Sequence, residues 1–362
     1  MIWYLLNIAI ISLAYFWPER EEALEAGFDV SYSKRKRVCT VGTISWIILS
    51  GLRHVSIGAD TERYKYAFEI VKHQSWNRIF GDLYDRYFQG VDIKDPGYPI
   101  FEKLCQVFSD SYQVFLVIIA TIFFVALGIF IFKLSSNPYL SYILFSTLFY
   151  SFFAITGHRQ TIATAFVVLL GSFLIKKRKF IPFLIVVLLA STIHLSCLCF
   201  LPFYFISRLK INKATMVMYW IAIILSFIYR YELMELLQSI IGYDQYGDYE
   251  GAKAGTFMYL LIALAVVVTV FHKRLLASSP ENMRISINAL MLACFFAPLL
   301  LINQSTMRVV QYFSLFLMLV LPELGQIFAK KTDKKLYTLF ATILLMALLV
   351  SNQPVYKFFW QH

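Results

Sequence analysis

Long apolar segments without a charged residue are the feature that most constrains how this chain can fold. Examples are Phe115–Phe132, Phe257–Val270 and Leu339–Val350. Such segments are typical of helices that cross a lipid bilayer. Charged residues make up only 15% of the 362 residues, whereas soluble domains carry about 25%. The sequence therefore predicts an all-α, polytopic integral membrane protein, and it excludes a soluble enzyme, a disulfide scaffold and a disordered chain.

Clusters of Lys and Arg set the predicted orientation, because the cytoplasmic loops of membrane proteins are enriched in these residues. The net charge of +11 is explained by such loops and does not indicate nucleic-acid binding. Placing every cluster in the cytoplasm predicts about ten full transmembrane helices, with both termini outside. The expected spans are 2–17, 39–52, 113–133, 139–157, 159–175, 214–230, 256–271, 286–303, 308–328 and 336–352.

Residues 180–206 do not fit that simple count, because this apolar run lies between two clusters that both belong in the cytoplasm. We therefore predict a hairpin of two short helices, about 180–190 and 194–206, that turns near His194. Each arm would be ~18 Å long, which is too short for ~30 Å of hydrocarbon. The turn should then lie at membrane depth and be covered by protein.

The whole chain, 1–362, is predicted to form one polytopic membrane domain with two long outer segments. The extracytoplasmic region 53–112 is rich in aromatic and charged residues, and Tyr64–Arg78 is typical of an amphipathic helix at the membrane interface. The outer loop 231–255 is rich in Tyr, Gly and Asp. That composition suits sugar recognition, although an ordinary loop looks much the same.

Three arginines lie at the outer ends of predicted spans, on the side where the positive-inside bias of membrane proteins disfavours them. Arg53 ends the second span, Arg159 begins the fifth and Arg308 begins the ninth. An arginine within hydrocarbon costs roughly 2.5–3.5 kcal/mol on insertion scales, so such residues usually mark a site or a pathway. Convergence of the three on one anionic ligand would offset this cost.

Simpler structural explanations exist for most of these positions. Arg53 could anchor its span at the interface. Arg308 could form a structural pair with Tyr312, which lies one helical turn further on. His194 could be a hydrogen-bonded core histidine. Arg159 points more strongly to function, because its polar neighbours place it at a helix N-terminus, where anions bind.

The region after Arg53 adds a denser group of polar residues. Asp60 and Tyr64 are spaced i, i+4, so they would share one face of a helix; Asp60 is also a plausible N-cap. Asp95 and Tyr98 lie in an Asp-Pro-Gly-Tyr sequence, which is an ordinary turn motif. Neither motif is diagnostic by itself.

The order of these motifs, over residues 50–322, resembles the EpsG family, which comprises Wzy-type polymerases of bacterial exopolysaccharide, capsule and O-antigen. The motifs that carry the resemblance are Gly51-Leu-Arg53, Gly58-x-Asp60-(x)3-Tyr64, Asp95-Pro-Gly-Tyr98, Arg159-Gln160-x-Ile-Ala163, His194-x-Ser196 and Arg308-(x)3-Tyr312.

This resemblance implies a GT-C-like glycosyltransferase of the bacterial cytoplasmic (inner) membrane, with its active site facing the periplasm. Its substrate would be oligosaccharide repeat units carried on undecaprenyl pyrophosphate. A chain-length regulator and a flippase are partners implied by the family alone. No cofactor is expected, and no metal, since the sequence shows no Gly-rich phosphate loop and no carboxylate cluster suited to Mg²⁺.

The expected chemistry is a single, inverting displacement in which the growing glycan leaves its lipid pyrophosphate. Arg53, Arg159 and Arg308 would hold that pyrophosphate through planar guanidinium groups. His194 is the preferred general base, because imidazole titrates near neutral pH; Asp60 is the alternative, with Asp95 as a further candidate. Expected substrate-binding residues are Arg53, Tyr64, Asp95, Tyr98, Gln160 and Tyr312.

Other classes of function stay open at this point. A flippase or another transporter of lipid-linked oligosaccharide would also hold a pyrophosphate, but it usually shows internal repeats. A membrane O-acyltransferase would use one intramembrane histidine and leave the outer arginines unexplained. An O-antigen ligase would share the chemistry and differ in its acceptor.

Overall fold

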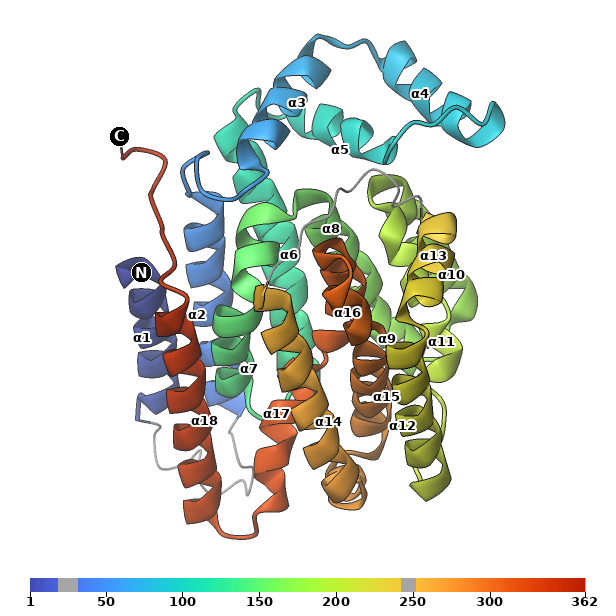
Figure 1. Cartoon of the computed structure of the whole chain (residues 1–362). Coiled ribbons are helices and arrows are strands. Elements are labelled where there is room, and N and C mark those ends of the chain that lie inside the picture. Colours follow the sequence, from blue (N-terminus) through green and yellow to red (C-terminus); the bar gives the residue numbers. More distant parts are fainter. Residues whose placement is uncertain (19–31, 242–251, 362) are drawn as a thin grey trace.

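The computed structural model describes residues 1–18, 32–241 and 252–361, and helices are the regular secondary structure of this part of the chain. Within it no strand is formed, and a single isolated β-bridge joins Arg53 to Phe358. The expected all-α class is therefore confirmed. Most helices stand side by side in an upright bundle, and three short ones lie across one end of it (Figure 1).

Five helical segments are long and apolar enough to cross a membrane, and up to seven do so if each of two bent pairs counts as one span. The long segments are Tyr112–Leu134 (α6), His158–Lys176 (α8, a π-helical stretch and α9), Gly255–Ser278 (within α14, Ala252–Ser278), Pro280–Leu301 (α15, Pro280–Phe296, and a 3-10 turn) and Lys331–Ser351 (α18). The bent pairs are α12 (Lys213–Ile228) with α13 (Arg230–Ile241), and α16 (Met307–Ser314) with α17 (Leu317–Leu324).

The expected count of about ten spans is higher than this, for two physical reasons. Four apolar helical segments of the bundle are short, namely Ile2–Phe16 (α1), Pro138–Phe149 (α7, Pro138–Leu144, with a π-helical turn), Phe180–Ile193 (α10) and Leu195–Ile206. In addition, α2 (Tyr32–Gly51) carries the four basic residues of cluster 34–37 in its first turns. For these segments, the crossings predicted from the charge clusters do not meet the criteria of length and apolar composition.

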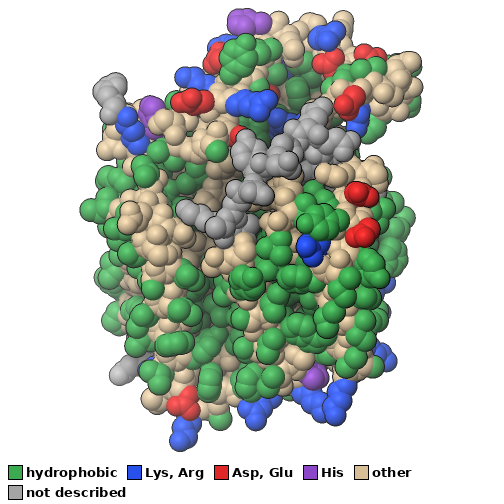
Figure 2. Space-filling model, in the orientation of Figure 1, with side chains coloured by type: hydrophobic (Ala, Val, Ile, Leu, Met, Phe, Trp, Pro, Cys, Tyr) green, Lys and Arg blue, Asp and Glu red, His purple; other side chains and the backbone are tan. Residues whose placement is uncertain are grey.

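The polarity of the surface follows the bundle axis (Figure 2). Apolar side chains cover its middle, and Lys and Arg gather at the end away from the three short helices. Charged residues of both signs cover the layer at the other end. The arrangement is that of a multi-pass membrane protein with a basic end and a mixed-charge end.

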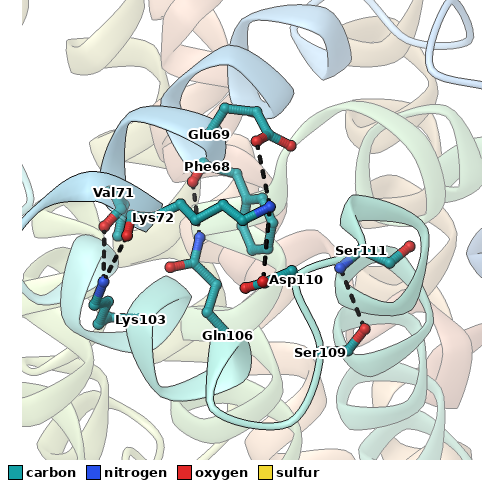
Figure 3. Close-up of polar contacts among 9 residues, drawn as sticks. All are labelled: Phe68, Glu69, Val71, Lys72, Lys103, Gln106, Ser109, Asp110 and Ser111. Carbon is teal, nitrogen blue, oxygen red and sulfur yellow. Dashed lines mark hydrogen bonds and ion pairs between the residues drawn. The ribbon is translucent and has the colours of Figure 1, made fainter.

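The layer across the bundle consists of α3 (Thr61–His73), α4 (Trp76–Phe88) and α5 (Gly97–Gln106). The expected interfacial helix at 64–78 is thus two helices, because α3 ends at His73 and Ser75 caps α4 by accepting a hydrogen bond from the Arg78 N–H at 3.3 Å. Side chains of α5 hold α3 in place: Lys103 Nζ donates to the Val71 and Lys72 carbonyls, and Gln106 donates to the Phe68 carbonyl at 2.8 Å (Figure 3).

The predicted short-helix pair has its break at His194, which adopts an extended conformation between α10 and the helical segment Leu195–Ile206. The two arms pack antiparallel. Phe183 near the start of α10 stacks on Tyr204, with ring centroids 5.5 Å apart, and the Cys197 thiol donates to the Val187 carbonyl. Of the expected outer loop 231–255, residues up to 241 belong to α13, and 242–251 lie outside the described residues.

Both termini lie at the end of the bundle that carries α3–α5 (Figure 1). Residues 355–361 return to the end of α2, where the His54 N–H donates to the Lys357 carbonyl at 2.8 Å and the Phe359 N–H donates to the Leu52 carbonyl at 3.0 Å. Phe358 also packs edge-on against Trp3 of α1. The turn that contains Arg53 is therefore held by both ends of the described chain.

Gly97, at the start of α5, lies directly against Thr192 of α10. A Cβ at this glycine would meet the Thr192 Oγ1 at 2.1 Å and its backbone carbon at 2.9 Å. Only a glycine lets the outer layer approach the His194 turn this closely.

We expect Gly97→Ala to lower stability by about 1–3 kcal/mol, because the added methyl group forces α5 away from α10. Gly81→Ala in α4 is the matched control, since a Cβ there has open space around it and alanine favours a helix. Thermal unfolding of both variants in detergent measures the difference. Equal unfolding temperatures would show that the contact does not constrain the outer layer.

Candidate functional site

The first three residues of α8 (His158–Thr164), namely His158, Arg159 and Gln160, connect three separate parts of the structure. A π-helical segment, Ser151–Thr156, precedes them and ends at Gly157, where the chain turns into α8. From this turn His158 reaches the end of α2, Arg159 reaches the loop before α5, and Gln160 reaches the start of α16. π-helical segments are frequent at functional sites, because they shift side chains out of the regular helical register.

Asp95 is the centre of the polar cluster. It precedes α5 with φ of 50°, a left-handed conformation that aspartate tolerates better than most residues. Its buried carboxylate accepts hydrogen bonds from Arg159 Nη1 at 2.9 Å and from the Leu195 N–H at 3.1 Å, and it lies 3.6 Å from His194 Nδ1. Burial alone would raise the pKa of Asp95, but His194, Arg159 and the Leu195 N–H outweigh it and lower the pKa to about 2.

A carboxyl group with this pKa is ionised near neutral pH and is a poor proton acceptor. Asp95 is therefore better suited to orient the Arg159 guanidinium and the His194 imidazole than to act as a base. The contact lies on Nδ1 of His194, which leaves the opposite ring nitrogen free to act.

His194 is 8% exposed; its Nδ1 faces the Asp95 carboxylate at 3.6 Å, and its Nε2 has no hydrogen-bond partner among the described residues. This does not match the alternative of a core histidine satisfied by protein hydrogen bonds. A buried polar group without a partner is costly. The imidazole is thus poised to bond to a ligand, and Asp95 fixes its position from one side.

Arg159 presents the exposed cation of the cluster, with 29% of its side chain accessible. Its guanidinium carbon lies 5.5 Å from the ring centroid of Tyr64 and 5.4 Å from that of Tyr98, distances at which cation–π attraction operates. Tyr64 also stacks on the His158 ring at 4.3 Å. Three of the expected binding residues, Arg159, Tyr64 and Tyr98, are therefore in mutual contact.

Arg53 lies deeper, with 2% of its surface exposed. It donates to the carbonyls of Ser50 and Ile155, the latter at 3.0 Å, and its Nη2 lies 2.7 Å from His158 Nε2. These contacts use much of its donor capacity within the protein. The placement favours a structural role for Arg53 rather than the phosphate binding that the sequence suggested.

Arg308 and Tyr312 share one turn of α16, as expected from their spacing. The Arg308 carbonyl accepts a hydrogen bond from Gln160 at 2.8 Å, and the fully buried Tyr312 hydroxyl lies 3.1 Å from the Ser196 hydroxyl. Tyr312 therefore ties α16 to the segment that follows His194. Burial raises the pKa of Tyr64 while the charges of Arg159 and Arg308 oppose this, so both arginines act on the same phenol.

Asp60 lies at the N-terminus of α3, partly exposed, and its side chain makes no capping hydrogen bond. Its charge acts on Tyr64, whose pKa it helps to raise. The carboxylate is thus on the outer side of the cluster, beyond the tyrosine that covers Arg159.

Glu102 is a buried carboxyl group to which the sequence analysis gave no role. It is 1% exposed, one helical turn after Tyr98, and its Oε1 has no partner among the described residues. Burial raises the pKa of Glu102 to about 8, although Arg159 and Tyr98 act in the opposite direction. Its spacing could have revealed it, because Tyr98, Glu102 and Cys105 form the buried face of α5.

No group of three or more His, Cys, Asp or Glu side chains that could hold a metal ion occurs in the part of the chain that the structure describes. The cluster instead offers a partly exposed guanidinium, a second arginine within electrostatic range and an imidazole whose Nε2 has no partner among the described residues. Such a set can bind an anionic oxygen ligand and accept a proton beside it.

The sequence model of the EpsG family matches residues 36–360, which include every residue of the cluster. No curated protein and no solved structure shows a significant match to the chain.

We expect Arg53→Lys to destabilise the protein more than Arg159→Lys does. The single ammonium of lysine at position 53 cannot replace two separate guanidinium nitrogens, of which Nη1 bonds to Ser50 and Nη2 to Ile155 and His158; unsatisfied buried groups cost about 1–3 kcal/mol. Lysine at position 159 keeps the ion pair with Asp95. Thermal unfolding in detergent compares the two, with the exposed Arg63→Lys as the control. A larger loss for the Arg159 variant would contradict the structural role of Arg53.

We also expect stability to fall as pH rises from about 5 to 8, in part because of Glu102. Its pKa is about 8 in the folded state and near 4.5 when exposed, so only the unfolded chain releases this proton in that range. Glu102→Gln should flatten the decline in unfolding temperature, whereas the exposed Glu62→Gln should not. Parallel pH profiles for wild type and Glu102→Gln would refute this assignment.

Proposed function

Because the chain belongs to the EpsG family of Wzy-like polysaccharide polymerases, we propose that it is a membrane glycosyltransferase that joins lipid-linked oligosaccharide repeat units into a polysaccharide. The single observation that carries the proposal is the Arg159–Asp95–His194 cluster. It puts a partly exposed guanidinium and an imidazole on either side of one buried carboxylate, and among the described residues the Nε2 of that imidazole has no hydrogen-bond partner.

The proposed donor is a glycan on undecaprenyl pyrophosphate, and the acceptor is a hydroxyl of an incoming repeat unit. Arg159 and Arg308 hold the pyrophosphate and stabilise the charge that develops on it as the glycosidic C–O bond breaks. His194 Nε2 takes the proton of the acceptor hydroxyl as its oxygen bonds to the anomeric carbon. A single displacement of this kind inverts the configuration at that carbon.

The other expected residues take supporting roles in this proposal. Asp95 orients His194 and Arg159, and Arg53 holds His158 beneath them. Tyr64 offers a partly exposed ring to a sugar, next to the bound phosphate, and the buried Tyr98 supports Tyr64 and Arg159 from inside. Asp60 stays the alternative base, since its partly exposed carboxylate lies on the side from which a water-soluble glycan would approach.

The proposed setting is the bacterial cytoplasmic membrane, with the basic end of the bundle in the cytoplasm and α3–α5 outside. In a GT-C-like arrangement of about ten crossings, α2 and the short apolar helices would complete the membrane-embedded bundle. The candidate cluster then lies at the outer end, where lipid-linked repeat units would be elongated. A chain-length regulator and a flippase would act beside it.

Reconstitution tests the function directly. Purified protein in nanodiscs is given undecaprenyl-pyrophosphate repeat units from the source strain, with EDTA and without nucleotide sugar. We expect a ladder that rises in whole repeat units. Transport of the lipid-linked unit across vesicles without any ladder would replace this proposal with a transporter, and addition of glycan to a different acceptor would indicate a ligase.

The same assay distinguishes the two candidate bases. We expect His194→Gln to lower the rate by a factor of about 10²–10⁴, the usual contribution of a general base, and Asp60→Asn to lower it far less. Arg159→Lys should also be slow, because the guanidinium fork is lost while the charge is kept. If Asp60→Asn abolishes the ladder and His194→Gln preserves it, Asp60 is the base.

A further inference from the structure

An apolar groove of about 470 Å³ lies between α4 and α10, beside the His194 turn. Aromatic residues of α4, among them Tyr84, Tyr87 and Phe88, form one wall, and Leu188 and Thr192 of α10 form the other. The proposed chemistry uses none of these residues, so the groove needs a separate explanation.

One end of the groove continues into the lipid-facing surface of α10. Ile181, Ile185, Leu188 and Leu189 are 49–65% exposed and recur at helical spacing. Exposed aliphatic residues along one side of a membrane helix are typical of contact with lipid chains. Leu188 belongs both to this row and to the lining of the groove, so the exposed face of α10 and the groove form one continuous apolar surface.

The other end of the groove lies next to the polar cluster. Thr192, which lines the groove, contacts Gly97, two residues after Asp95, and the helix break at His194 follows two residues after Thr192. The groove is therefore bordered by an aliphatic surface at one end and by the segments that carry Asp95 and His194 at the other. This sequence of environments is complementary to an amphiphile with an apolar tail and an anionic head.

The lining of the groove favours a hydrocarbon tail over a sugar. The hydroxyl groups of Ser191 and Thr192 donate to carbonyls of their own helix, each at 2.8 Å, so neither has a hydrogen left to donate to a glycan. Tyr84 and Phe88 stack on each other along α4, and both are more than half exposed. An aromatic face of this kind suits the interface between lipid and water.

Building on the proposed function, we propose that this groove binds the isoprenoid chain of the lipid-pyrophosphate carrier. The chain enters along α10, passes under α4 and delivers its pyrophosphate to Arg159 and His194. The outer layer would then act as a cover for the first isoprene units as well as a wall of the sugar site.

Photolabelling tests this assignment without requiring turnover. Undecaprenyl pyrophosphate that carries a diazirine in the isoprene units nearest the phosphate is added to wild-type protein in phosphatidylcholine nanodiscs. We expect labelled peptides from α4 and α10, and we expect unlabelled undecaprenyl pyrophosphate to compete. Competition by free repeat-unit oligosaccharide, or by added phosphatidylglycerol to the same extent, would overturn the assignment.

A second apolar groove supplies a matched control. It has a volume of about 530 Å³ and is lined by Ala214, Val217 and Ile221 of α12. Leu188→Trp should fill the proposed groove and reduce labelling about tenfold, whereas Val217→Trp should leave it unchanged. Phe88→Ala removes an aromatic ring from the opposite wall without adding bulk, and it should also weaken labelling. This second variant keeps the test valid if the Trp variant does not fold. Equal labelling of all variants, or labelling mainly on α12, would overturn the proposal.

The outcomes separate this proposal from the polymerase function. A protein that labels in the groove but forms no ladder binds the carrier without being the polymerase. A protein that forms a ladder and labels elsewhere is the polymerase with a different lipid site.

Discussion

The buried carboxylate of Asp95 is the interaction on which the arrangement of this protein depends. It receives Arg159 from α8 and the Leu195 N–H from the segment after α10, and it faces His194. One side chain thus joins the outer layer to two parts of the bundle. Ionised carboxylates are buried only when such partners stabilise them. The burial of Asp95 therefore requires that the outer layer, α8 and the segment after α10 lie together.

The sequence predicts the class of the fold and much of the cluster because both leave strong local signals. Charge-free runs identify membrane helices, and the polar residues at His194 and Arg159 stand out within them. The break at His194 was predictable because charge placement requires an even number of crossings between residues 179 and 208. Spacing alone also placed Arg308 and Tyr312 on one helical turn.

Other features depend on tertiary burial and leave no comparable signal. Arg53 and Arg159 were both expected to hold phosphate, yet Arg53 is buried and donates to backbone carbonyls, whereas Arg159 is partly exposed. Glu102 resembles any charged residue of an amphipathic helix until its environment is known. The count of about ten crossings was predicted from apolar runs and charge clusters, whereas length and composition of the described helices identify five to seven candidate spans.

The return of residues 355–361 to the turn that holds Arg53 has a consequence for biogenesis. Tyr356 bonds to the carbonyl of Leu49, 307 residues earlier in the chain. Translation and membrane insertion proceed from the N-terminus. The turn that holds Arg53 is therefore made long before residues 355–361, which contact it in the folded protein. Arg53 supports His158, the neighbour of Arg159. The turn that supports His158 therefore gains these contacts only after α18 has been made.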